Sequence, residues 1–229
     1  MPLLGFKLSK VIPKDLLIDN KSSINTDSMN FLSIDCSTDI GSLFLKTKSK
    51  SFSKILQSDK SNIDLLVMNI LDFFNENKVD FKDISEILVN QGPGNFSSLR
   101  GSLAVAKGLS LAKNLKLFGY NTFIWSCSKF IKQKGTIYSL IKFRGKYFVK
   151  KFDKNLTVIS KTEKITEEEI IKKCNSNFKV ITTSNAKDFD KNILKLGNIN
   201  IVDLDHNNLE LLQLKGFLNK DMIKPLYLS

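Results

Sequence analysis

Residues 90–101, NQGPGNFSSLRG, connect an apolar run to a run of small residues, and the fold of the first half depends on how they are interpreted. Three glycines and Pro93 favour a tight turn, and the residues after it favour a helix from about Ser97 to Lys113. A glycine-rich turn between a strand and a helix is one way of binding phosphate. The alternative is a turn whose glycines allow close packing.

The turn fits close packing better than phosphate binding. Its letters match neither GxGxxG nor GxxxxGK[ST], and Pro93 removes one amide donor. In the helix that follows, Gly101, Ala104, Gly108 and Ala112 form a stripe of small residues. Glycine inside a helix costs about 1 kcal/mol relative to alanine, so close approach of another element is needed to compensate. We therefore predict a tightly packed helix after the turn.

Strands and helices alternate on both sides of this turn. Periodicity predicts strands over 31–37, 42–48, 84–91 and 115–121, a helix over 61–78, and a hairpin turned through Asp39–Gly41. The second half predicts a hairpin over 136–153 turned at Arg144–Gly145, helices over 166–174 and 208–220, and strands over 178–184 and 199–205. This alternation predicts an α/β protein in two halves that meet near Thr122–Lys134.

The helix over 61–78 has more apolar surface than one sheet can cover. Ile63, Leu66, Ile70 and Phe74 form one buried stripe, and further apolar side chains (Leu65, Met68 and Leu71) lie beside it. A helix with so wide an apolar arc is covered on more than one side. Either the helix is enclosed within its own domain, or its second side faces another protein. Periodicity alone leaves both open.

The formal net charge of +12 does not by itself indicate nucleic-acid binding. Almost all of the 35 basic residues are lysines, and Arg100 and Arg144 are the two arginines. Lysine reads bases less specifically than the planar fork of arginine, so solvated surface lysines are favoured. No apolar run approaches the ~20 residues of a membrane span. We expect a cytoplasmic protein that does not contact a membrane.

Few residues are available for catalysis or metal binding. Cys36, Cys127 and Cys174 are far apart in the sequence, which is typical of a reducing compartment and favours neither disulfides nor zinc. The single histidine, His206, is expected on a surface loop or at a helix cap. Without a second histidine, neither a metal site nor a catalytic triad is predicted.

Four segments together resemble the TsaB (YeaZ) family, the small subunit of the bacterial tRNA threonylcarbamoyladenosine machinery. Residues 90–112, NQGPGNFSSLRGSLAVAKGLSLA, are similar to its GPGSFTGLR segment and the helix after it. FLSIDCST (31–38) resembles the family's opening strand, SNIDLLVMNILDFF (61–74) its first long helix, and IKPLYLS (223–229) its end. The resemblance covers the chain from about Met29 onward.

Several positions depart from the family pattern. Ser97 and Ser98 replace a threonine and a glycine, Ser61 stands where the family often has a histidine, and Lys142 replaces an acidic residue. The final residue is Ser229 where the family has arginine. Roles that depend on the missing groups are not carried over to this chain.

The resemblance implies an actin/sugar-kinase/Hsp70-like (ASKHA) fold with lobes over 29–125 and 126–229, after an N-terminal extension over 1–28. The extension is either an optional tail or the product of a start codon placed too early. The resemblance further implies a non-catalytic subunit that holds TsaD in a competent state and helps to recruit the ATPase TsaE and tRNA. ATP and a divalent metal are then expected in the partner subunits, with no cofactor bound by this chain alone.

The implied contact with TsaD is a mixed bundle made by the two long helices. The residues expected in it are Leu65, Met68, Ile70, Leu71, Ser97, Gly101, Ala104, Val105 and Gly108. A vestigial nucleotide side would include Asp35, Ser37 and Gly94, although Asp35 is better explained as an acceptor for backbone amides of the following turn. A homodimer through the same helices is equally compatible with an exposed apolar face.

Two other functions remain open at this point. One is an autonomous nucleotide-dependent enzyme of the same fold, a kinase or a peptidase. It is disfavoured because the glycines of the second half are isolated and build no second phosphate loop. The other is a direct tRNA-binding module that acts through its lysines, for which binding would depend steeply on salt.

Overall fold

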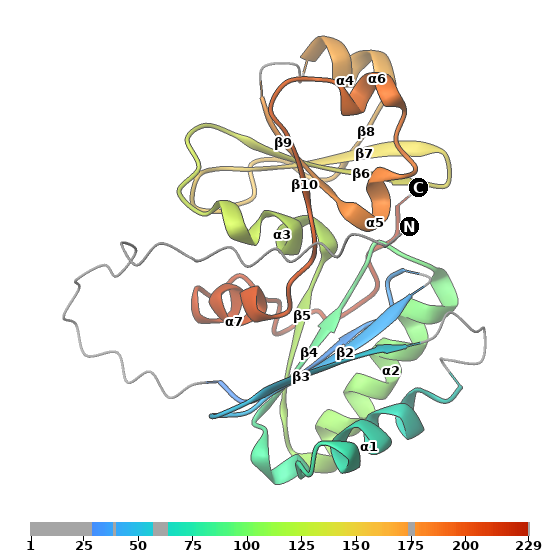
Figure 1. The fold of residues 1–229 in the computed structure, drawn as a ribbon, viewed down its shortest axis with the longest axis vertical. Helices are drawn as coiled ribbons and strands as arrows, with labels where there is room; N and C mark the ends of the chain where they lie inside the picture. The colour runs from blue at the N-terminus through green and yellow to red at the C-terminus, as the bar shows by residue number, and fades with distance from the viewer. Residues whose placement is uncertain (1–28, 39, 57–63, 174–176, 229) are drawn as a thin grey trace, which may run out of the picture.

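The computed structural model describes residues 29–38, 40–56, 64–173 and 177–228, so the expectations for the N-terminal extension lie outside the described residues. The chain forms two five-stranded sheets, one above the other, with helices between them and on their outer sides (Figure 1). The first sheet has the order β3-β2-β1-β4-β5. Its strands are β1 (Phe31–Asp35), β2 (Gly41–Lys46), β3 (Ser51–Leu56), β4 (Glu86–Asn90) and β5 (Lys116–Tyr120).

The second sheet repeats the topology of the first. Its strands are β6 (Ile137–Phe143), β7 (Lys146–Phe152), β8 (Glu163–Ile165), β9 (Phe178–Thr182) and β10 (Ile199–Val202), in the order β10-β9-β6-β7-β8. In each sheet three successive strands form an antiparallel meander, and the fourth strand then pairs in parallel with the first. The fifth strand pairs in parallel with the fourth. The two lobes are therefore built on one plan, although no sequence repeat is visible.

The helices lie in three places: on the outer side of the first sheet, between the two sheets, and in the second lobe. α1 (Leu66–Glu76) and α2 (Phe96–Lys113) cover the outer side of the first sheet, while α4 (Glu167–Lys173), α5 (Thr183–Ala186) and α6 (Lys191–Leu194) belong to the second lobe. α3 (Thr122–Cys127) and α7 (Asn207–Leu214) lie between the sheets (Figure 1). Short 3-10 helices occur at Phe81–Asp83 and Ser128–Phe130. β1 is buried on both faces: Phe31 joins the core between the sheets, and Leu32 joins the core under α1 and α2.

Most elements confirm the predicted pattern, but several short elements are missing from it and two helices are shorter than predicted. Both predicted hairpins form, and Arg144 and Gly145 take positive φ angles of 49° and 74° at the second turn. β3, β8, α3, α5, α6 and the two 3-10 helices were not predicted, and the closing helix expected over 208–220 ends at Leu214. The helix expected over 61–78 begins at Leu66, and residues 61–63 lie outside the described residues.

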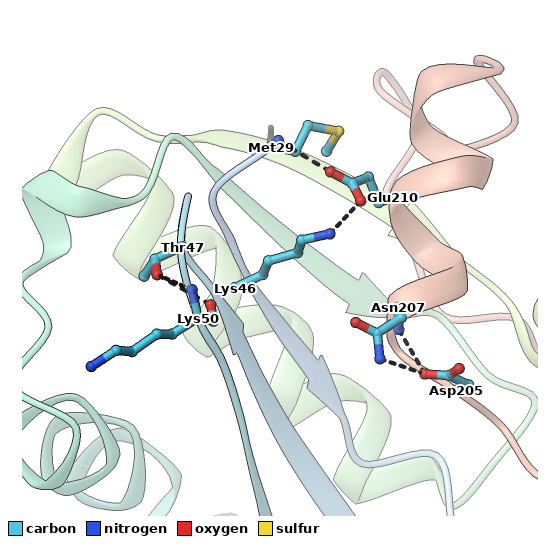
Figure 2. Close-up of polar contacts among 7 residues, drawn as sticks. All are labelled: Met29, Lys46, Thr47, Lys50, Asp205, Asn207 and Glu210. Atoms are coloured by element: carbon cyan, nitrogen blue, oxygen red, sulfur yellow. Dashed lines mark hydrogen bonds and ion pairs between the residues drawn. The ribbon is translucent and has the colours of Figure 1, made fainter. Parts of the chain in front are cut away.

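The C-terminal segment crosses back to the first lobe. Figure 2 shows Glu210 of α7 between Lys46 of β2, with which it forms an ion pair, and the backbone nitrogen of Met29, 3.2 Å from Glu210 Oε1. Further along, Asn219 forms a bridge with Gly119 of β5. The last residues thus join the two lobes. Across the described residues, every helix is too short or too polar to cross a lipid bilayer.

Candidate functional site

The glycine-rich turn is a packing device in this structure. A Cβ added to Gly94 would lie 2.1 Å from the carbonyl oxygen of Ser37, so the turn presses directly on the backbone that follows β1. Gly92 has φ +106°, a conformation that L side chains rarely adopt. The Asn95 side chain caps α2 by accepting a hydrogen bond from the Ser97 amide at 3.1 Å. Close packing, the alternative favoured by the sequence, therefore explains the turn.

A buried polar network fixes the ends of β1 and β4 next to this turn. Asp35 Oδ1 accepts hydrogen bonds from the Ser37 amide at 2.9 Å and from Asn90 Nδ2 at 3.1 Å. The same Asn90 nitrogen reaches Thr122 Oγ1 at 3.2 Å, and Asn90 Oδ1 accepts from the Gly92 amide at 2.8 Å. Burial raises the pKa of Asp35, and these hydrogen bonds oppose the rise. Asp35 accepts the backbone amide of the following turn, as the sequence favoured.

The outer side of the α1–α2 layer exposes apolar and small side chains. Leu65, at the start of α1, is 50% exposed, Met68 is 55% exposed and Leu71 is 38% exposed. On α2, Leu111 is 85% exposed, and the small residues Ala104 and Gly108 are also exposed. We call these six residues the docking face. Figure 1 shows α1 and α2 side by side, away from the second lobe. The pair of helices thus carries apolar surface that its own lobe does not cover.

The predicted contact residues do not all lie on the docking face. Ile70 is fully buried against the first sheet, so its inclusion was wrong: the i, i+4 spacing that suggested contact is the core stripe shared with Leu66 and Phe74. Gly101 and Val105 are half-buried, and Ser97 is exposed near the helix start. A Cβ on Gly108 would meet no atom within 4 Å, so no close neighbour inside the described chain explains that glycine.

Comparison with known proteins shows which family this chain is similar to. The family model described as TsaD: tRNA N6-adenosine threonylcarbamoyltransferase matches residues 59–179, just over half of the chain. A Buchnera aphidicola protein (from Acyrthosiphon pisum), named tRNA threonylcarbamoyladenosine biosynthesis protein TsaB, is 25% identical over 154 residues, which cover 65% of this chain and 70% of the relative. A second TsaB, from the Buchnera of Baizongia pistaciae, is 32% identical over 84 residues, 37% of this chain and 38% of that protein. The chain belongs to the TsaB/YeaZ family.

A solved structure shows the family's fold. YeaZ from Pseudomonas aeruginosa superposes with a TM-score of 0.65 at 14% identity, covering 87% of this chain and all of that one. The likeness confirms the predicted two-lobed ASKHA fold. The stretch matched by the TsaD family model contains both helices of the docking face.

His206 of this TsaB/YeaZ family member lies at the N-cap position of α7, one of the two positions that the sequence predicted, but its side chain is half-buried and makes no capping hydrogen bond. The ring points inward and stacks on Phe44, with centroids 5.2 Å apart. Nδ1 lies 3.1 Å from Ser33 Oγ and Nε2 lies 3.0 Å from Ser42 Oγ. Burial lowers the pKa of His206 to about 4, so the ring is neutral at pH 7. Both nitrogens are occupied, and the histidine joins α7 to the first sheet.

The two cysteines that the structure describes in full are also structural. Cys36 and Cys127 are free and buried, and burial raises the pKa of each thiol to about 12. Such thiols are poor nucleophiles at neutral pH because the thiolate is not populated. In the described part of the chain, no three His, Cys, Asp or Glu side chains come together as a metal site.

Proposed function

We propose that this chain is a non-catalytic subunit of the threonylcarbamoyladenosine machinery, and that it acts by docking its α1–α2 layer onto TsaD. TsaD would transfer the threonylcarbamoyl group to N6 of adenosine 37 in tRNAs that read codons beginning with A. The observation that carries the proposal is the docking face, an apolar surface on two packed helices. The relatives named for threonylcarbamoyladenosine biosynthesis support the process.

The composition of the docking face favours a protein partner. Soluble monomers rarely expose large contiguous apolar patches, and such patches mark contact sites. Complete burial of one leucine or methionine side chain contributes about 1.5–3 kcal/mol. Leu65, Met68, Leu71 and Leu111 are each between one-third and nine-tenths exposed, so all four have area left to bury.

A partner of the same fold suits the shape of this surface. The TsaD family model matches the segment that forms α1 and α2, so TsaD has an equivalent segment of its own. Two equivalent helix layers can pack face to face through ridges and grooves. Ala104 and Gly108 have little or no side chain, and the open space around Gly108 leaves room for close approach of a partner helix.

The buried polar groups also favour a non-catalytic role. Asp35 is 5% exposed and its Oδ1 accepts hydrogen bonds from Ser37 and Asn90, which fits a structural role at the end of β1. His206 is held between two serines. The same proposal places ATP and the divalent metal in the partner subunits, and it includes TsaE and tRNA as members of the wider complex.

Co-purification with the TsaD of the same organism tests the proposal. Met68→Glu and Ala104→Arg each place a charge on the docking face and are expected to weaken the complex at least about a hundredfold, which is ~2.7 kcal/mol of lost or opposed burial. The matched control is Ile201→Glu. Ile201 is 51% exposed on β10 of the other lobe, and this change should leave binding unaltered.

Each result bears on a different part of the proposal. If all three folded variants bind equally well, the docking face is not the interface. If the unmodified chain forms no complex with TsaD, the proposed function itself fails. A homodimer that the same two substitutions dissolve would show that copies of this chain compete for the same surface.

A further inference from the structure

Gln91 binds the chain segment after α7 to the glycine-rich turn. Its Nε2 donates to the carbonyl oxygens of Met222 at 3.2 Å and Lys224 at 2.8 Å, and its Oε1 accepts from Asn219 Nδ2 at 2.6 Å. The Gln91 backbone oxygen accepts from the Leu226 amide, also at 2.6 Å. The last part of the chain, which follows the second lobe, is therefore fixed to the strand end that leads into α2.

This attachment is closely packed as well as hydrogen-bonded. Gly119 of β5 and Asn219 exchange two backbone hydrogen bonds, at 2.9 and 2.8 Å. A Cβ on Gly119 would lie 2.4 Å from Gln91 Oε1. A Cβ on Gly92 would lie 3.2 Å from the carbonyl oxygen of Leu226. Two glycines thus leave the space that the segment and the Gln91 side chain occupy, so the segment is built into the first lobe.

The attachment places an aromatic side chain against the first residue of α2. Tyr227 stacks on Phe96, with ring centroids 5.2 Å apart and an angle of 23° between the rings. Tyr227 is 50% exposed and Phe96 is 48% exposed. Aromatic side chains contribute large apolar areas to protein contacts and are enriched in them. About half of each side chain is therefore left for a further molecule to cover.

Arg100 connects this stack to the docking face. Its guanidinium carbon lies 4.9 Å from the centroid of the Phe96 ring. Ala104 follows Arg100 by four residues in α2, and Gly108 follows Ala104 by four. Residues four apart are neighbours on a helix surface, and Ala104 and Gly108 belong to the docking face. The apolar surface of the docking face therefore continues, through Arg100, to the aromatic stack at the start of α2.

The charge of Arg100 has no counterion in the part of the chain that the structure describes. None of the described carboxylates lies within ion-pair distance of its guanidinium, which is exposed. A guanidinium can stack on an aromatic ring and still bind a carboxylate through two parallel N–H donors. Arg100 therefore favours an acidic group on the molecule that covers the stack.

We propose that Phe96, Arg100 and Tyr227 form a second part of the contact with TsaD. In it, a carboxylate of TsaD binds the Arg100 guanidinium, and an apolar side chain of TsaD covers the stacked rings. We call these three residues the tail contact. The tail contact rests on the proposed function, because it names the chemistry that the same partner presents beside the docking face.

Two features favour this occupant. The tail contact is continuous with exposed leucine and methionine side chains, which a protein surface covers and an RNA strand would leave in water. A carboxylate on the partner also complements a chain whose formal net charge is +12. Gln91 is then a positioning residue, because it holds the segment that carries Tyr227 in place beside Phe96.

The test measures the affinity of the full chain for the TsaD of the same organism by calorimetry. Arg100→Gln should weaken binding at least about tenfold, because a two-donor, charge-assisted contact is lost. It should also reduce the dependence of binding on salt. The matched control is Arg144→Gln, which removes the same charge from an exposed turn of the second lobe and should change binding less than about twofold.

Tyr227 and Gln91 test the aromatic half of the tail contact. Tyr227→Ala should weaken binding about tenfold, whereas Tyr227→Phe keeps the ring and should change it less than about threefold. Gln91→Ala should also weaken binding, but it should add little in a chain that already carries Tyr227→Ala, because both changes remove the same ring from the contact. Thermal unfolding without TsaD checks that each variant folds. Because Tyr227 is half-exposed, its two variants carry the test if Gln91→Ala does not fold.

The outcomes separate the tail contact from the docking face. If Met68→Glu weakens the complex but Arg100→Gln and Tyr227→Ala do not, docking on α1 and α2 stands and the tail contact is wrong. Equal weakening by Arg100→Gln and Arg144→Gln also overturns it, because net charge would then explain the effect. Loss of binding to a tRNA transcript, with binding to TsaD unchanged, would assign the surface to RNA instead. If the unmodified chain forms no complex, the proposed function fails together with the tail contact.

Discussion

The two lobes have the same strand order, yet they present different outer sides. The first sheet is covered by α2, 18 residues long, and α1, 11 residues long, whose outer side exposes leucine, methionine and small residues. The second lobe's α4, α5 and α6 have four to seven residues, and none of their described large apolar side chains is exposed. The common sheet thus supplies the architecture, while the length of the covering helices and the exposed apolar side chains on them distinguish the first lobe from the second.

The largest expected change in the free energy of unfolding comes from shortening a side chain on the inner side of α1, compared with one on its outer side. Ile70→Ala removes a fully buried side chain and should lower the free energy of unfolding by about 2–5 kcal/mol. Met68→Ala, on the outer side, should change it by less than about 0.5 kcal/mol. Chemical denaturation of both variants measures the difference. Equal losses would show that the outer side is already packed within the chain.

The joint between the lobes should respond to pH through His206. Its pKa is lowered from 6.5 to about 4 in the folded chain, so the unfolded chain binds more protons between these values. Stability is fully present above pH 6.5 and is lost as the pH falls toward 4, by about 3 kcal/mol in total. His206→Gln should remove this component.

Urea unfolding at several pH values measures the effect of His206. Because the chain has one histidine, the difference between the unmodified chain and His206→Gln isolates it from the carboxylates. A difference that stays constant from pH 7 to pH 4 would contradict the inward position of the ring.

The smallest expected effects compare two glycines of the same turn-and-helix unit. Gly94→Ala forces a methyl group against the Ser37 carbonyl and should cost about 1–3 kcal/mol. Gly108→Ala meets open space in a helix and should stabilise the isolated chain by about 0.5–1 kcal/mol. Thermal unfolding gives both signs. The same Gly108→Ala change should weaken the complex with TsaD, and equal or tighter binding would show that no partner helix approaches there.

Local patterns in the sequence were sufficient for most of the fold. Apolar runs and turn residues predicted eight of the strands, both hairpins and the long α2 helix. β3 was missed because its alternation, SFSKIL, is mostly polar and half-exposed at a sheet edge. α3 was missed because TFIWSC is buried on all sides between the sheets and shows no amphipathic stripe.

The candidate site was predicted less completely than the fold. Periodicity placed Ile70, Leu65 and Met68 on one wide apolar arc, but it could not tell which part of the arc the sheet covers. The sequence predicted a loop or a helix cap for His206, but it could not show that the ring points inward, because its partners Ser33 and Ser42 are more than 160 residues away in sequence. A cavity between the lobes likewise joins Thr122 to Arg144 and Lys187 across two sheets.

The sequence by itself therefore determined most of the helices and strands and the tight turn at Gly94. Apolar periodicity and the conformational freedom of glycine depend only on residues that are close together in the chain. The side of each helix that remains uncovered, the burial of the histidine and the grouping of cations around one cavity depend on which distant segments pack together. That packing is set by the balance of all buried surface at once, and no window of neighbouring residues contains it.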